Sequence, residues 1–149
     1  MQEKNSSEYF LLNEQLARDT IALGTFPLCL VLLMNDCQYP WVILVPRRTR
    51  IREIYELTQL DQQQLLLESA SLGRLMMETF AGEKLNVAAL GNVVSQLHIH
   101  HLVRYHNDPA WPRPVWGIFP PVRYSANELL VQKKKIVKKL CSSEISFKP

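Results

Sequence analysis

Three side chains capable of chemistry recur at every other position within residues 85–104, namely Gln96, His98 and His100. Two runs of β-favouring residues flank the Gly91-Asn92 pair in this stretch. Because successive side chains of a strand point to opposite faces, we expect Gln96, His98 and His100 to form a row on one face. Such a row of amide and imidazole groups could grip one small anionic ligand.

Two other interpretations of the histidines stay open. Paired histidines on an exposed strand face can simply be solvated. A His-x-His pair can also chelate zinc or copper, and His101 offers a third imidazole to His98 and His100. Zinc sites recruit three or four protein ligands, and the three cysteines lie far from this stretch without a CxxC pair. We therefore expect no metal and no cofactor.

Residues 94–104, VSQLHIHHLVR, resemble the histidine triad (HIT) family, whose motif is His-φ-His-φ-His-φ-φ with φ apolar. The resemblance covers roughly residues 28–104, and the following DPAWPRPVWG resembles a bacterial subgroup of HIT proteins. The sequence departs from the motif twice. Gln96 stands where the first histidine belongs, and His101 stands where an apolar residue belongs.

The resemblance implies a nucleotide hydrolase or nucleotidyl transferase. The middle histidine of the family motif is the nucleophile and matches His98, and the last histidine matches His100. By resemblance, His98 attacks the α-phosphorus and holds the nucleotidyl group covalently. The expected ligands are purine nucleotides, as mononucleoside conjugates or dinucleoside polyphosphates. The alternative is a nucleotide-binding protein that is catalytically weak or inactive because Gln96 replaces a histidine.

Four polar side chains are expected to bind the substrate. Gln96 offers two N–H donors and no titratable proton, so it can bind phosphate but cannot shuttle a proton. Asn92 matches a family position that contacts phosphate, Asn86 is a weaker match to another polar position, and Asn35 resembles the residue that touches the ribose. Each asparagine can instead be an ordinary turn former.

The pattern of apolar residues predicts an α+β fold. The expected elements are an amphipathic helical stretch within 6–19, strands over 21–23, 28–34 and 41–45, a long helix over 60–80, two strands joined by Gly91-Asn92, and a final helix over 124–140. Thr58 is the expected N-cap of the long helix. One long helix cannot supply several crossovers, so the sheet should be mostly antiparallel with that helix on one face. The HIT resemblance implies the same arrangement with five strands, usually paired into a dimer.

The proline-rich residues 107–117 should be irregular, and their Trp111 and Trp116 need a surface to cover. That surface is this sheet, a partner subunit or a bound base. Together with the family resemblance, the segment leads us to expect a homodimer.

Composition indicates one globular domain spanning residues 1–149, with 47% apolar residues and a formal charge of +3. The mild positive charge suits an anionic substrate and argues against a nucleic-acid partner. No apolar run is long enough for a membrane span, and the polar N-terminus is unlike a secretory signal. The odd number of cysteines favours a reducing compartment, so we expect a cytoplasmic location. Lysines within 133–139 should form a solvated helix face, and the arginines within 47–52 are either solvated or bind phosphate.

Overall fold

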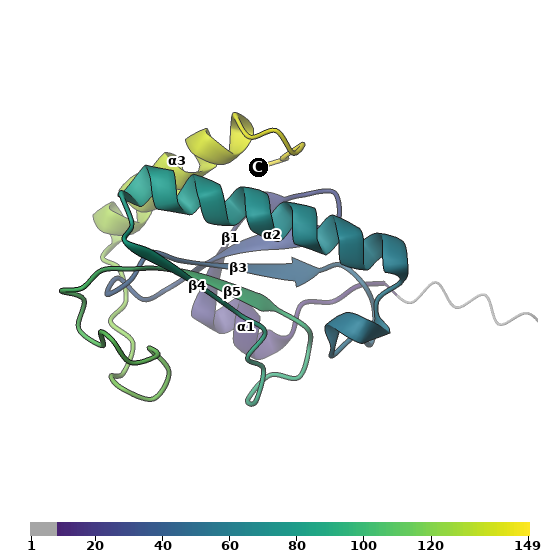
Figure 1. Ribbon diagram of the computed structural model, residues 1–149, viewed down its shortest axis with the longest axis horizontal. Helices are drawn as coiled ribbons and strands as arrows, with labels where there is room; N and C mark the ends of the chain where they lie inside the picture. Colours follow the sequence, from purple (N-terminus) through teal and green to yellow (C-terminus); the bar gives the residue numbers. More distant parts are fainter. Residues whose placement is uncertain (1–8) are drawn as a thin grey trace, which may run out of the picture.

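The computed structural model describes residues 9–149 and contains one antiparallel sheet with helices on both faces (Figure 1). Its elements are α1 (Glu14–Asp19), β1 (Thr20–Thr25), β2 (Cys29–Met34), β3 (Trp41–Pro46), the 3-10 helix η1 (Ile54–Glu56), α2 (Gln59–Phe80), β4 (Lys84–Ala88), β5 (Ile99–Arg104) and α3 (Ala126–Cys141). The strand order is β1-β2-β3-β5-β4, and every pairing is antiparallel. This confirms the α+β, five-stranded prediction.

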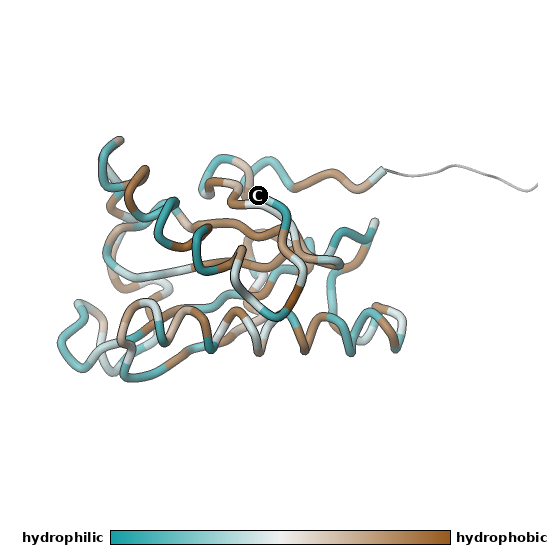
Figure 2. The backbone as a smooth tube through the Cα atoms, turned by 90° about the horizontal axis from the view of Figure 1, so that it is seen from above, coloured by the Kyte–Doolittle hydropathy of each residue, from teal (hydrophilic) through white to brown (hydrophobic). Residues whose placement is uncertain are grey.

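The sheet is covered on both faces, which explains the continuous apolar runs of β2 and β3. Alternate side chains such as Val31 and Leu44 join a core with Leu72 and Met76 of α2. The intervening side chains join a second core on the face where α1 lies (Figure 1). Apolar colour follows the strands through the middle of the molecule, whereas many outer loops are hydrophilic (Figure 2).

The helix boundaries follow their capping chemistry. The Thr58 hydroxyl accepts from the Asp61 N–H at 3.2 Å, which confirms the predicted N-cap of α2. Ser125 and Glu128 form a capping box at the start of α3, and the lysines of α3 are largely exposed. The predicted end of the long helix at residue 80 is confirmed, and the C-cap Ala81 takes the left-handed conformation with φ 48°.

The connection between β4 and β5 is longer than predicted. Residues 89–98 form an irregular segment, and β5 begins only at Ile99. The Leu97 N–H donates to the Ile51 carbonyl at 2.9 Å, so this part of the chain bonds to another loop and not to β4. Likewise, α1 begins only at Glu14, behind the N-cap Asn13. Residues 6–8 of the helical stretch expected within 6–19 lie outside the described residues.

A buried cation holds the segment after β5 against the sheet. Arg104 is 1% exposed and forms a bidentate pair with Asp108, with N–O distances of 2.7 and 3.0 Å. Its remaining donors bond to Asn86 Oδ1 at 2.8 Å and to the Arg113 carbonyl at 2.9 Å. The guanidinium also lies 5.6 Å from the Trp111 ring centre. The tryptophan-bearing segment is therefore fixed to its own sheet.

The outer edge of β1 is partly closed by the C-terminal residues. Thr25 and Lys148 exchange two backbone hydrogen bonds of 2.7 and 2.9 Å. Phe147 packs edge-on against Phe26, with ring centres 5.7 Å apart. A side chain at Gly24 would collide with the Lys148 carbonyl, which lies 2.2 Å from the Cβ position. A register shift between Ala22 and Gly24 interrupts the same strand.

None of the helices within residues 9–149 has the length and apolar character needed to cross a bilayer.

We predict that Asp108→Ala destabilises the fold by about 3–5 kcal/mol, because it leaves the buried Arg104 charge without its partner. Urea unfolding monitored by circular dichroism measures this change. The control is Arg48→Ala, which breaks the more exposed Arg48–Asp61 pair and should cost about 1 kcal/mol or less. Equal losses in the two variants would contradict the prediction.

Candidate functional site

A pocket of about 240 Å³ lies on the α1 face of the sheet, and His98 and His100 both line it. Its walls come from α1, the ends of β2 and β3, the 89–98 segment and the segment after β5. The lining residues are Gln15, Leu16, Asp19, Met34, Trp41, Ile43, Leu90, Gly91, Asn92, Val93, Val94, His98, His100 and Trp116. The surface is largely apolar, and its polar side chains are Gln15, Asp19, Asn92 and the two imidazoles. The Gln15 amide donates to the Asp19 carboxylate at 2.7 Å.

The geometry of His98 leaves one ring nitrogen available. Its Nδ1 lies 2.6 Å from the Gln96 carbonyl oxygen, which can only accept, so Nδ1 carries the proton. The lone pair is then on Nε2, which has no hydrogen-bond partner within residues 9–149. Gly91 packs against this ring, since a side chain there would meet the Val94 carbonyl at 2.6 Å and His98 Cε1 at 3.3 Å. His98 is thus held in the Nδ1–H tautomer, with its lone pair on Nε2.

Both ring nitrogens of His100 are occupied. Nε2 donates to the Leu90 carbonyl at 3.0 Å, and Nδ1 accepts from the Trp41 indole N–H at 3.1 Å. Burial lowers the pKa of His100 from 6.5 to about 4. Its ring packs edge-on against His98 and Trp116, with centres 4.8 and 5.1 Å away. In this arrangement both ring nitrogens of His100 are bonded within the chain, so the ring presents no free N–H to a ligand.

His101 points to the opposite face, as predicted, and contacts α2. Its Nε2 lies 2.8 Å from the Ser69 hydroxyl, and its Nδ1 lies 3.2 Å from the Ile99 carbonyl. Burial lowers the pKa of His101 to about 4 as well. The sheet therefore separates His101 from His98 and His100. In the described part of the chain, no three His, Cys, Asp or Glu side chains are grouped to hold a metal ion.

The predicted position of Gln96 is wrong. Its Oε1 accepts from the Asn13 N–H at 2.9 Å, and its Nε2 donates to the Leu11 carbonyl at 2.8 Å. Both polar atoms of the amide are directed at the chain before α1 and not into the pocket. The strict alternation assumed from residue 96 fails because regular strand geometry starts only at Ile99.

The three asparagines have different surroundings. Asn92 lines the pocket and makes no hydrogen bond with any other residue in 9–149, so its amide is available to a ligand. Asn86 accepts from the buried Arg104, and Asn35 accepts from the Tyr124 N–H at 3.1 Å. Neither Asn86 nor Asn35 lines the pocket. Asn35 lies in a bend directly after β2, as a turn former would, whereas Asn86 lies within β4 and is not a turn residue.

Several pocket residues were not foreseen from the sequence. Trp41 had a detectable signal, since a tryptophan in a buried strand needs a partner for its indole N–H. Trp116 covers the pocket from this same chain, with its ring centre 5.9 Å from that of Trp41. Leu16 and Asp19 of α1 line the pocket together with residues 90–100. Because these segments are far apart in the sequence, no local sequence pattern predicts their contact.

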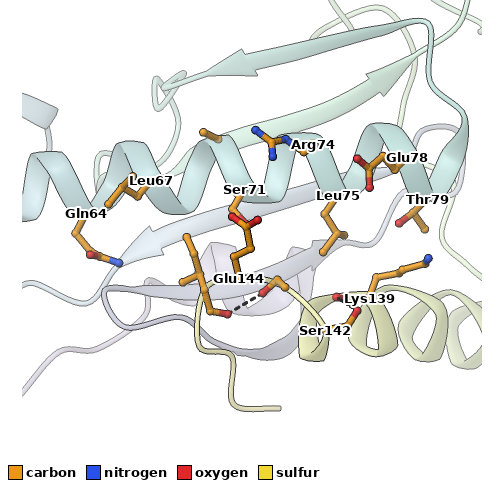
Figure 3. Close-up of a pocket in the computed structure, with 13 residues that line it drawn as sticks. Gln64, Leu67, Ser71, Arg74, Leu75, Glu78, Thr79, Lys139, Ser142 and Glu144 are labelled. Atoms are coloured by element: carbon orange, nitrogen blue, oxygen red, sulfur yellow. Dashed lines mark hydrogen bonds between the residues drawn. The ribbon is translucent and has the colours of Figure 1, made fainter.

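A larger cavity, of about 720 Å³, lies between α2 and the chain after α3 (Figure 3). Its charged side chains have both signs, with Arg74 and Lys139 opposed by Glu78 and Glu144. It therefore has no net preference for an anion. The arginines after β3 do not line the histidine pocket either: Arg47 donates to backbone carbonyls of residues 26–28, and Arg48 pairs with Asp61.

Comparison with known proteins agrees with this geometry. The profile of the HIT domain matches residues 15–107, more than half of the chain. The chain belongs to the HIT family. Among solved structures, a histidine triad protein from Marinobacter aquaeolei VT8 is 58% identical with a TM-score of 0.87, over 89% of this chain and 96% of that one. No curated protein matches the sequence significantly.

Two other bacterial HIT structures are similar along nearly their whole length. A histidine triad protein from Bradyrhizobium japonicum is 42% identical with a TM-score of 0.86, over 88% of this chain and 98% of that one. One from Sinorhizobium meliloti 1021 is also 42% identical, with a TM-score of 0.85, over 87% and 96%. Membership of the HIT family implies nucleotide hydrolase or transferase activity in general terms.

We predict that this HIT domain loses stability as the pH falls from 6.5 towards 4. The pKa values of His100 and His101 are lowered to about 4 in the folded state, so the unfolded chain binds protons there that the folded chain does not. Each histidine then contributes up to about 1.4 kcal/mol per pH unit. Urea unfolding at several pH values measures the slope.

The control for this titration is a substitution that removes no titratable group. His101→Gln should flatten the dependence of unfolding free energy on pH, whereas Val131→Ala, at an exposed position of α3, should leave it close to that of the unmodified protein. An identical slope in all three proteins would contradict the assignment.

Proposed function

We propose that this HIT protein is a nucleotide hydrolase or nucleotidyl transferase that acts at the α-phosphate through a covalent nucleotidyl-His98 intermediate. The observation that carries the proposal is the hydrogen bond from His98 Nδ1 to the Gln96 carbonyl, at 2.6 Å. It leaves the Nε2 lone pair for attack in a pocket that Asn92 also lines.

The proposed reaction has two displacements. His98 Nε2 donates its lone pair to the α-phosphorus, and the leaving group departs with the electron pair of its bond and takes a proton from solvent. Water, or an acceptor alcohol in a transferase, then attacks the same phosphorus and loses its proton. The phosphorus–nitrogen bond breaks, its electron pair returns to Nε2, and the nucleotide is released.

The roles of the other residues follow from their contacts. The free Asn92 amide would donate to a non-bridging phosphate oxygen, and such donors commonly contribute about 3 kcal/mol to transition-state stabilisation. His100 holds the His98 ring in place through edge-on packing, and the Trp41 indole fixes His100. Asn35, Asn86 and the side chain of Gln96 have no direct role in this scheme.

The apolar walls of the pocket suit a nucleoside. Leu16, Ile43 and Trp116 offer surface for a base. The volume of about 240 Å³ is below the roughly 300–1,000 Å³ typical of sites for drug-sized ligands. We therefore favour one purine nucleoside as the bound moiety, with the rest of a conjugate or dinucleoside polyphosphate extending into solvent.

The second candidate is a nucleotide-binding protein with weak or no turnover, suggested by the glutamine at the first triad position. The position of the Gln96 side chain argues against this candidate. Because the amide bonds to the chain before α1, its replacement of a histidine removes no group from the phosphate side of the pocket.

We further propose that the protein forms a homodimer through β4 and the neighbouring face of α2. The order of strands leaves β4 at an edge of the sheet, and Val87 on it is 49% exposed. Beside it lies a mainly apolar hollow of about 550 Å³ that also includes Ile54 and Leu66. A second copy would cover these side chains. The expected contribution of the tryptophans is not supported, since Trp111 and Trp116 pack on their own chain.

We predict that His98→Gly abolishes turnover, by about 10⁴-fold or more, while AMP affinity stays within about tenfold because binding is spread over several groups. Rapid quench with a radiolabelled AMP conjugate should trap nucleotide on the unmodified protein and none on the variant. His106→Ala, outside the pocket, is the control. Turnover of His98→Gly within a few-fold of the unmodified protein would exclude the mechanism. Turnover without trapped nucleotide would favour direct attack by water.

For the dimer, we expect sedimentation at micromolar concentration to give the mass of two chains. Leu66→Glu should shift the protein to a monomer, because a carboxylate would be buried without a partner in the interface. The matched control is Leu130→Glu, an exposed leucine on α3, which should leave the dimer intact. A monomeric unmodified protein would refute this part of the proposal.

A further inference from the structure

The side chain of Gln96 bonds to two backbone groups of the segment before α1. Its Oε1 accepts from the Asn13 N–H, and its Nε2 donates to the Leu11 carbonyl, at 2.9 and 2.8 Å. A carbonyl and an N–H two residues apart point to the same side of an extended chain, as in a sheet. A primary amide presents an acceptor and a donor side by side and so matches both groups at once.

An imidazole does not have this match. A neutral histidine also has one donor and one acceptor, but its two ring nitrogens face away from each other. A histidine at position 96 could therefore bond to the Leu11 carbonyl or to the Asn13 N–H, but not to both. The glutamine at this position is therefore suited to holding the segment before α1. Both of its polar atoms are used in that contact and not in binding phosphate.

The segment that Gln96 holds leads directly into the pocket wall. Asn13 is the N-cap of α1, with its Oδ1 accepting from the Gln15 N–H at 2.8 Å. α1 then places Leu16 and Asp19 against the pocket. A helix of six residues has little stability of its own, so its position depends on what fixes its ends and its buried side chain. Leu16 is that buried side chain, at 6% exposed.

We propose that Gln96 is a positioning residue that holds α1 as a wall of the nucleotide pocket. The inference rests on the proposed nucleotide function and gives a role to the one triad position where this chain departs from its family. Gln96 acts on the substrate only through the segment 11–19. The side chains that α1 brings to the pocket contact the nucleoside, so loss of the Gln96 amide weakens nucleotide binding more than it slows the chemical step.

The backbone of Gln96 has a second contact, to His98. The backbone carbonyl of residue 96 accepts from His98 Nδ1. This carbonyl is kept whichever side chain replaces that of Gln96. Substitutions at residue 96 therefore separate the two contacts, because they remove the bonds to Leu11 and Asn13 and keep the acceptor that fixes the tautomer of His98.

Hydrogen exchange followed by mass spectrometry tests the contact without any need for turnover. Gln96→Ala removes both hydrogen bonds, and the nearly isosteric Gln96→Glu removes the one donated to the Leu11 carbonyl. In both variants, amides within residues 10–19 should exchange about tenfold faster or more. The matched control is Gln38→Ala. The Gln38 amide also joins distant segments, through the Pro120 carbonyl at 3.0 Å, and it does not line the pocket. Its loss should leave exchange within 10–19 unchanged.

Binding and kinetics test the consequence. In Gln96→Ala, the Kd for AMP, followed by tryptophan fluorescence, should rise about tenfold. KM should rise similarly, while kcat should fall by less than about threefold. Gln96→His should resemble Gln96→Ala in exchange, because it cannot make both bonds.

Three outcomes would overturn the inference. These are unchanged exchange within 10–19, faster exchange with unchanged AMP affinity, and a loss confined to kcat, which would indicate direct participation of Gln96 in the reaction. Absence of turnover in the unmodified protein would refute the proposed hydrolase or transferase activity. The exchange and AMP-binding results would still test whether Gln96 holds α1 against the pocket.

Discussion

Burial of three imidazoles at the start of one strand constrains the whole site. A buried polar atom without a partner is costly, and β5 lies in a sheet covered on both faces. Both nitrogens of His100 and of His101 accordingly have partners, and each bond fixes a tautomer. The exception is Nε2 of His98, which borders the pocket. Among the ring nitrogens of these three histidines, Nε2 of His98 is therefore the one left available to a ligand in the described part of the chain.

Those partners come mostly from outside regular structure. The carbonyls of Leu90 and Gln96 belong to the irregular segment between β4 and β5, which must curve back over the strand to reach the imidazoles. Gly91 permits this close approach, because a larger residue would press on the Val94 carbonyl and the His98 ring. The tryptophan-bearing segment closes the other side and is fixed by the buried Arg104–Asp108 pair. The conformation of these two loop segments therefore determines how the His98 and His100 rings are oriented in the pocket.

Local chemistry was the part of the fold that the sequence predicted well. The cap at Thr58, the final helix expected over 124–140 and the apolar runs of β2 and β3 each depend on residues a few positions apart. Alternation also placed His100 and His101 on opposite faces correctly. The start of β5 was wrong, because residues with a high preference for strands occupy a segment that bonds to Ile51.

The site was predicted less completely than the fold. Alternation predicted that His98 and His100 share a site, and the family resemblance added Asn92. Neither could distinguish Gln96 from a phosphate ligand. Its partners Leu11 and Asn13 lie more than 80 residues away in the chain. Asn35 and Asn86 were misplaced for the same reason, because Tyr124 and Arg104 are also tertiary partners. Which distant group a polar side chain bonds to is determined only when the chain is folded, so the local sequence does not predict it.

The two edges of the sheet have different capacities for self-association. Unpaired strand edges are templates for aggregation, and bulges or covering segments are the usual protection. β1 has both, through its register shift and the bridge from Thr25 to Lys148. A strand from a second copy would therefore meet more obstruction at β1 than at β4. A two-fold pairing of β4 with β4 uses the same edge on both chains, so such growth ends at two copies and cannot continue into a filament.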